Sequence, residues 1–231
     1  MYIWQEIAYI SSRNQKIMEV KMEELTKEQI EQMIKEGKSL KDMDFSFAEL
    51  DGIDFSGQDL SGATFTGAEI RNANFEGANL EGAFIADADF SGSNFKNANL
   101  SRAVLQRVNL RDTDFTNANL YKAQILVCDA TNADFTGADM RETRLEKTRF
   151  RKAKMDRADI SYSNMRSTDF EGATFIKTKF SYSDLRKAKI QKTWFEDVEA
   201  EQVMVYGKKP WSEGSKAKLD VEEIKAPNWD D

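Results

Sequence analysis

Large apolar side chains recur at every fifth residue through most of the chain. From Leu40 to Phe195, each multiple of five holds Phe, Leu, Ile or Met, except Ala130. The residue two positions before each is usually Ala, Ser or Thr, and the other three are mostly polar. A helical period near 3.6 or a strand alternation of 2 does not produce this spacing. A strict short period predicts a repeat architecture, in which each unit buries its apolar side by stacking on its neighbours.

The residue two positions after each large one is a turn signal. Nine of the twelve glycines occupy this slot, together with Asn72, Asn97, Asn117 and Asn132. Glycine and asparagine tolerate positive φ, so we expect the slot to be the left-handed residue of a type II turn. After Gly92 the slot mostly holds Arg, Lys, Glu or Tyr. Because these residues disfavour positive φ, the later coils are predicted to use a different turn type.

The pentapeptides Ala73-Asn74-Phe75-Glu76-Gly77 and Ala98-Asn99-Leu100-Ser101-Arg102 resemble the A(D/N)LXX consensus of the pentapeptide-repeat family. The resemblance extends over about residues 38–197. It implies an all-β solenoid, a right-handed quadrilateral β-helix of about eight coils with four pentapeptides each. Residues 20 apart then stack, and the column from Phe55 to Phe195 is nearly all Phe. Like-on-like ladders of this kind are what a 20-residue coil predicts.

The ends of the chain do not follow the period. We divide it into an N-terminal extension (1–25), a capping helix (26–37), the β-helix (38–197), a C-terminal cap or partial coil (198–211) and a charged tail (212–231). Thr26 and Gln29 have the spacing of a capping box, and Gly37 ends the helix. The helix is expected to cover the first coil, whose edge and core would otherwise be exposed. A start at Met22 would leave this cap intact, so residues 1–21 are a candidate dispensable extension.

Composition argues against catalysis. The chain has no histidine and one cysteine, which excludes a Cys/His zinc site and a histidine-based triad. No phosphate-binding loop or acid–base pair is visible, so we predict a protein that is not an enzyme and has no cofactor or metal. A single cysteine forms no internal disulfide, which favours the cytoplasm. No apolar run is long enough for a membrane span, and the net charge of −7 argues against direct nucleic-acid binding.

Charge is segregated along the chain. Residues 1–140 have a net charge of −10, residues 141–195 of +8 and residues 196–231 of −5. The basic region includes eight side chains that we call the basic collar: Arg141, Arg144, Lys147, Arg149, Arg151, Lys152, Lys154 and Arg157. They span a full coil and so surround the rod. The collar is either a solvated surface or a docking site for a partner.

An apolar patch interrupts the polar outer positions. Phe84 and Val104 occupy the slot that Asp or Asn usually holds, and Leu126 and Val127 follow Ile125 on the same side. Such a patch is covered by another part of the chain, contacts a partner or second copy, or has no role. The segment with Trp4 and Ile7 is the candidate internal cover.

Two nearly identical six-residue segments, 161–166 and 181–186, lie 20 residues apart, which is one coil. They align Tyr162 with Tyr182 and Arg166 with Arg186. Stacking predicts a tyrosine pair beside two arginines. This is either a stabilising ladder or a recognition surface for an acidic partner, since Tyr and Arg are favoured contact residues.

Ala130 is the one small residue at the large positions, and Val108 and Cys128 are larger than the usual alanine at the neighbouring small positions. We interpret these three residues as volume compensation within one stretch of the core. Cys128 is therefore expected to be a buried packing residue rather than a reactive thiol.

These features favour a non-enzymatic β-helical scaffold or protein-interaction module, with an unknown protein partner and a possible homodimer. The resemblance implies an alternative, because some family members mimic DNA and bind a type II topoisomerase, DNA gyrase. The acidic first coils agree with that alternative, and the basic collar departs from it.

Overall fold

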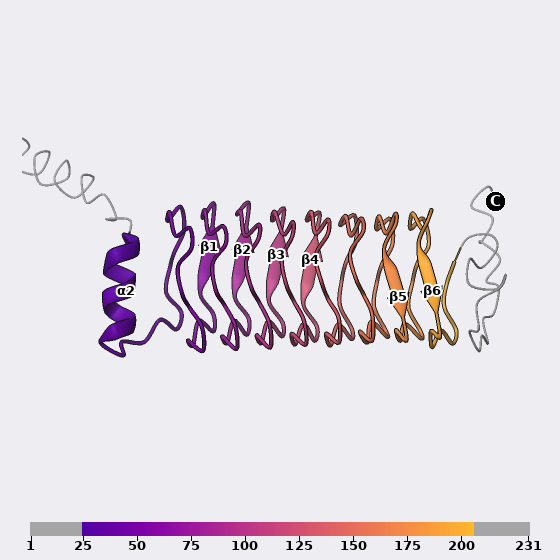
Figure 1. The fold of residues 1–231 in the computed structure, drawn as a ribbon, viewed down its shortest axis with the longest axis horizontal. Coiled ribbons are helices and arrows are strands. Elements are labelled where there is room, and N and C mark those ends of the chain that lie inside the picture. Colours follow the sequence, from indigo (N-terminus) through magenta and orange to yellow (C-terminus); the bar gives the residue numbers. More distant parts are fainter. Residues whose placement is uncertain (1–24, 206–231) are drawn as a thin grey trace, which may run out of the picture.

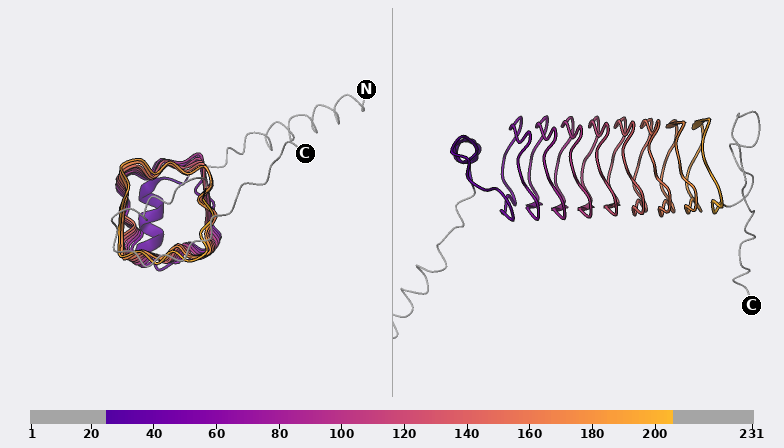
Figure 2. Two further views of the ribbon diagram at one scale, coloured as in Figure 1. Left: turned by 90° about the vertical axis from the view of Figure 1, so that its right-hand side faces the viewer. Right: turned by 90° about the horizontal axis from the view of Figure 1, so that it is seen from below.

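The computed structural model describes residues 25–205 as a straight rod of stacked coils (Figure 1). Strands β1 (Thr64–Thr66), β2 (Phe84–Ala86), β3 (Val104–Gln106) and β4 (Gln124–Leu126) form one parallel sheet. On another side, β5 (Thr174–Ile176) pairs with β6 (Trp194–Glu196). Helix α2 (Lys27–Lys35) lies across one open end of the rod (Figure 2).

In every strand pair, the two paired residues are 20 positions apart in the sequence. Phe84 pairs with Val104, and isolated bridges repeat the same offset from Asp44–Thr64 to Asp184–Met204. Each coil therefore contains four pentapeptides, one per side of the square outline in Figure 2. The predicted β-solenoid is confirmed.

The large residue of each pentapeptide points into the rod. Phe75, Phe95, Phe115 and Phe135 are buried, and neighbouring rings in this column stack with centroids 4.7–4.8 Å apart. Their ring planes differ by only 4–6°. The ladders that the sequence predicts are thus the core of the protein.

The turn slot has positive φ throughout the rod. Gly52 has φ 65° and Asn117 has φ 57°, as predicted, but Lys122 and Arg157 also have φ 60°. The prediction of a different turn in the later coils was wrong. The reason is that the coils stack on one another. The Lys122 N–H donates a hydrogen bond to the Arg141 carbonyl oxygen of the next coil at 3.0 Å, and the N–H groups of equivalent turn residues make the same bond along the rod. These hydrogen bonds hold the backbone against a local cost of about 1–2 kcal/mol per residue.

The first coil is covered by α2. The Thr26 hydroxyl accepts from the Gln29 N–H at its N-terminus, and Ile30 is fully buried against the core. At the other end, the bridges continue to Met204, and Val205 is buried. The predicted roles of residues 1–24, of the C-terminal cap after residue 205 and of the charged tail (212–231) lie outside the described residues. No helix in the described part of the chain is long and apolar enough to cross a membrane.

Candidate interaction surface

One side of the rod differs from the others in its outward residues. We call the side with β1–β4 the sheet face, and the side with β5 and β6, half a coil away, the opposite face. None of the residues that flank the inward side chains of β1–β4 is ionisable: Thr64, Thr66, Phe84, Ala86, Val104, Gln106, Gln124 and Leu126. The equivalent slots of the opposite face hold Glu76, Lys96, Asp114 and Asp134. The part of the sheet face formed by β1–β4 is therefore an uncharged surface on a charged rod.

The predicted apolar patch lies on this face. Phe84 and Val104 are direct neighbours in the sheet, and the Phe84 side chain is 42% exposed. Leu126 lies in the neighbouring column, aligned with Gln106, and the column of Phe84 continues with Gln124. Val127 lies at the corner that follows β4 and is 51% exposed. The four residues thus share a face without forming a single row.

The same corner column holds an aromatic residue that the sequence analysis did not select. Phe47 is 65% exposed and lies over Gly67, where an added Cβ would be 2.7 Å from the Phe47 ring. Phe47 occupies a turn slot, where the repeat usually has glycine or a polar residue. This departure from the pattern was the sequence signal that could have identified it. Between Phe47 and Val127, the corner holds Gly67 and then Asp87 and Arg107, which pair with each other at 2.6 Å. The corner thus has an exposed apolar residue at each end, separated by one ion pair.

Beyond β4 the sheet face becomes basic. A hollow there has Leu126 and Val127 at its apolar end, and Arg144, Lys147 and Arg166 also line it. Glu146 is its one carboxylate; one oxygen lies 3.3 Å from Arg144 Nη2, and the other is buried without a hydrogen-bond partner. The hollow thus combines an apolar end with an excess of positive charge.

The tyrosine pair is stacked on the corner that precedes the sheet face, whereas Val127 and Lys147 lie on the corner that follows it. The rings of Tyr162 and Tyr182 are parallel within 3°, with centroids 5.0 Å apart, and both are exposed. Arg186 forms an ion pair with Asp184 at 2.6 Å, and Arg166 lies 3.8 Å from the same carboxylate. The arginines are therefore partly neutralised, whereas the aromatic ladder is open to solvent.

Ion pairs also neutralise much of the basic collar. Five of its members lie 2.6–3.8 Å from a carboxylate: Arg141, Arg144, Arg149, Arg151 and Lys154. Within residues 25–205, Lys147, Lys152 and Arg157 form no ion pair. All three occupy turn slots of one coil, so the unneutralised charge is at three corners. The collar is thus less cationic than its composition indicates.

Cys128 and Ala130 belong to the core. Both are buried, and the Cys128 thiol lies 3.4 Å from the carbonyl oxygens of Leu105 and Leu126. Burial raises the pKa of this thiol to about 12. A thiol of this kind is almost entirely protonated at neutral pH and is a poor nucleophile.

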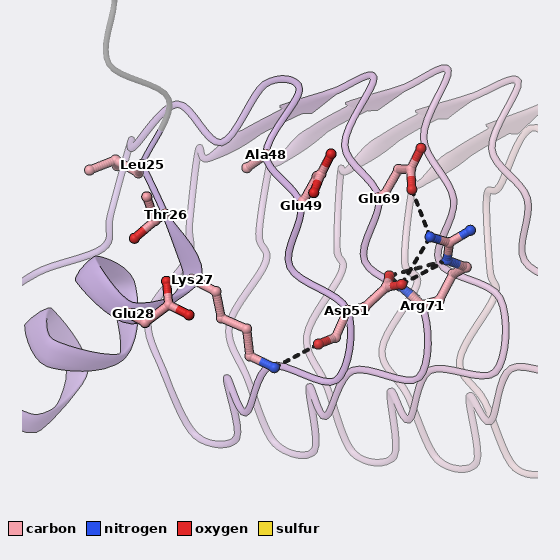
Figure 3. Close-up of a pocket in the computed structure, with 9 residues that line it drawn as sticks. All are labelled: Leu25, Thr26, Lys27, Glu28, Ala48, Glu49, Asp51, Glu69 and Arg71. Atoms are coloured by element: carbon pink, nitrogen blue, oxygen red, sulfur yellow. Dashed lines mark hydrogen bonds and ion pairs between the residues drawn. The ribbon is translucent and has the colours of Figure 1, made fainter.

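A second hollow lies where α2 meets the first coils (Figure 3). Lys27 Nζ donates to the Asp51 carbonyl oxygen at 2.6 Å, and Arg71 bridges Asp51 and Glu69 at 2.9 and 2.7 Å. The Lys27 contact joins the cap to the rod, and the Arg71–Asp51 pair joins two neighbouring coils. Among residues 25–205, no three His, Cys, Asp or Glu side chains are grouped as a metal site would require.

Comparison with family models identifies the repeats. The model "Pentapeptide repeat region" matches residues 86–155, and "Pentapeptide repeats (8 copies)" matches 39–77, 48–92 and 153–191. Together they cover the rod from residue 39 to 191, and neither describes a catalytic family. No curated protein matches the chain.

Several solved structures are similar to this chain. QnrB1, a plasmid-mediated fluoroquinolone resistance protein, has 19% identity and a TM-score of 0.50, over 67% of this chain and 85% of that one. HetL of Nostoc sp. strain PCC 7120, involved in heterocyst differentiation regulation, has 19% identity and a TM-score of 0.42, over 77% and 95%. A protein of the Arabidopsis thaliana thylakoid lumen is 38% identical, with a TM-score of 0.41, over 41% and 66%. At 19% identity and a TM-score of 0.50, the likeness to QnrB1 concerns the fold alone.

Proposed function

The chain belongs to the pentapeptide-repeat family, and we propose that it is a non-catalytic, cytoplasmic scaffold that binds a protein partner through its sheet face. The interior is filled by side chains, so recognition takes place on the outer positions. The lone cysteine is buried and protonated, which suits a reducing compartment.

The observation that carries this proposal is the absence of charge on β1–β4. A flat surface with an exposed Phe84 and no ionisable flanking residue has the composition of an interface core, where charged residues are depleted and aromatic residues enriched. The opposite face, whose columns contain charged residues, does not have this composition.

Affinity capture from the source cell tests the proposal. The variant Phe84→Asp/Leu126→Asp places two charges on the sheet face, and Asn94→Asp/Thr136→Asp places two at the same levels of the opposite face. Losing two apolar anchors of about 1 kcal/mol each should reduce capture by about tenfold or more. The opposite-face variant should bind normally. Equal capture by both variants, with normal circular dichroism, would refute the proposal.

If residues 1–21 or a second copy of the chain covers the apolar patch, other measurements should change. If residues 1–21 cover it, their removal should increase the binding of a hydrophobic dye, and unchanged binding would count against an internal cover. If a second copy covers it, the same aspartate substitutions should convert a dimer into a monomer in sedimentation velocity. Tyr162→Ala/Tyr182→Ala tests in the same capture whether the tyrosine ladder belongs to the partner site.

A second candidate is the DNA-mimic function, with a type II topoisomerase as the partner. Asp44, Glu49 and Asp54 support it, because they form no ion pair with any residue from 25 to 205 and lie on successive sides of the first coils. A gyrase supercoiling assay tests it. Inhibition, or relief of quinolone inhibition, should weaken in Asp44→Asn/Asp54→Asn. Unchanged supercoiling at the highest soluble concentration would exclude this function.

A further inference from the structure

We propose that the acidic end of this chain, Trp229 with Asp230 and Asp231, docks in the hollow formed by Leu126, Val127, Arg144, Lys147 and Arg166. The inference rests on the proposed function of the sheet face and names the segment that occupies its basic end when no partner is bound.

The path of the chain favours this occupant. Val205 lies 80 residues after Ile125 and therefore in the same column of the sheet face, so the chain leaves the described structure on this face. Four coil steps separate the two, a distance of about 19 Å. The 23 residues between Val205 and Trp229 span up to about 75 Å when extended. Trp229 reaches the hollow without crossing a corner of the rod.

The chemistry of the segment complements the hollow. Leu126 and Val127 offer an apolar contact for the Trp229 ring, and the three cations that line it suit the two adjacent carboxylates. Lys147 forms no ion pair within the described residues, so its charge is available to Asp230 or Asp231. Pairs of this kind favour one docked register over others.

The N-terminal segment complements this hollow less well. Residues 1–24 and residues 206–231 each have a net charge of −1, but the acidic residues of the C-terminal segment gather at its end. Residues 219–231 contain five acidic residues and one lysine, whereas residues 1–24 contain Arg13, Lys16 and Lys21. The apolar residues of the N-terminal segment are complementary to the uncharged part of the sheet face. The acidic residues 219–231 are complementary to the positive charge of the hollow.

Disulfide trapping in the full-length protein tests the inference. Asn228→Cys is combined with Gln106→Cys, which lines the hollow, or with Thr116→Cys, the same slot half a coil away on the opposite face. Native Cys128 does not compete, because its thiol is buried and has a pKa of about 12. Docking predicts intramolecular cross-linking to position 106 that is at least about fivefold faster than to 116, since it raises the local concentration there. Ser167→Cys, also in the hollow, gives an independent attachment point.

A matched charge pair provides the control. Lys147→Glu reverses the free charge at the hollow, and Lys152→Glu makes the same change at the next corner of the same coil. Glu142 occupies the equivalent slot with φ 58°, so glutamate is tolerated there. Lys147→Glu should reduce the preference for position 106 to near one, and Lys152→Glu should preserve it.

Three results would overturn the inference. Equal rates at 106 and 116, or no cross-link at either, would show that the segment does not dock. A cross-link between molecules whose yield rises with protein concentration would assign the hollow to a second copy. These experiments use the purified chain without a partner, so they succeed or fail independently of the capture that tests the proposed function.

Discussion

Replacing Phe115 by alanine should remove a large part of the stability of the rod. Its ring is fully buried between Phe95 and Phe135, with centroid distances of 4.7 and 4.8 Å. A buried Phe→Ala change costs about 3–5 kcal/mol through lost transfer free energy and the cavity left behind. Two stacked pairs contribute about 0.5–1.5 kcal/mol each. The expected loss is therefore about 4–8 kcal/mol, a large fraction of the 5–15 kcal/mol that is usual for a folded protein.

Urea unfolding followed by circular dichroism measures this loss. Phe115→Leu keeps most of the apolar volume and loses the two ring stacks, so we expect about 1–3 kcal/mol. Phe84→Ala is the surface control; its side chain is 42% exposed, and it should cost less than about 1 kcal/mol. A loss below about 2 kcal/mol for Phe115→Ala, or an equal loss for Phe84→Ala, would refute the distinction between core ladder and binding surface.

Three further predictions concern the turns, the thiol and the ion pairs. Lys177 has φ 57°, so Lys177→Gly should raise the unfolding free energy by about 0.5 kcal/mol, and a decrease would contradict the strain argument. Because burial raises the pKa of Cys128 to about 12, iodoacetamide at pH 8 should label the unfolded chain far faster than the folded one; similar rates would show an accessible thiolate. A hydrogen bond from Arg141 lowers the pKa of Asp139, so its stabilising contribution, present above about pH 4, disappears as the pH falls through the lowered value. Arg141→Gln should lose less stability on acidification than the wild type, and parallel losses would exclude this linkage.

The fold could be predicted from the sequence because one structural requirement repeats in every pentapeptide. Leu60, Phe75 and Ala98 each occupy an inward slot that the five-residue register alone identifies. The turns after Gly92 were mispredicted for a physical reason. Intrinsic φ preference is a local property, whereas the turn at Lys122 is held by a hydrogen bond to Arg141 in the next coil.

The surface was predictable only in part. Phe84 and Val104 were identifiable as neighbours because the 20-residue offset places them in one column. The neutralisation of the collar was not identifiable, because it depends on side-chain conformations such as that of Arg151, whose Nε lies 2.8 Å from Asp169. Phe47 was overlooked because its slot normally holds a turn residue, and its packing over Gly67 required coordinates.

Photo-cross-linking from single positions in the source cell tests the central claim most directly. A benzoylphenylalanine is introduced at Val104, on the sheet face, or at Asp114, the same slot half a coil away on the opposite face. The proposed interface predicts a covalent adduct with a partner protein from position 104 and none from position 114. An adduct from 114 alone, or equal adducts from both, would contradict the assignment of the uncharged sheet face as the binding surface.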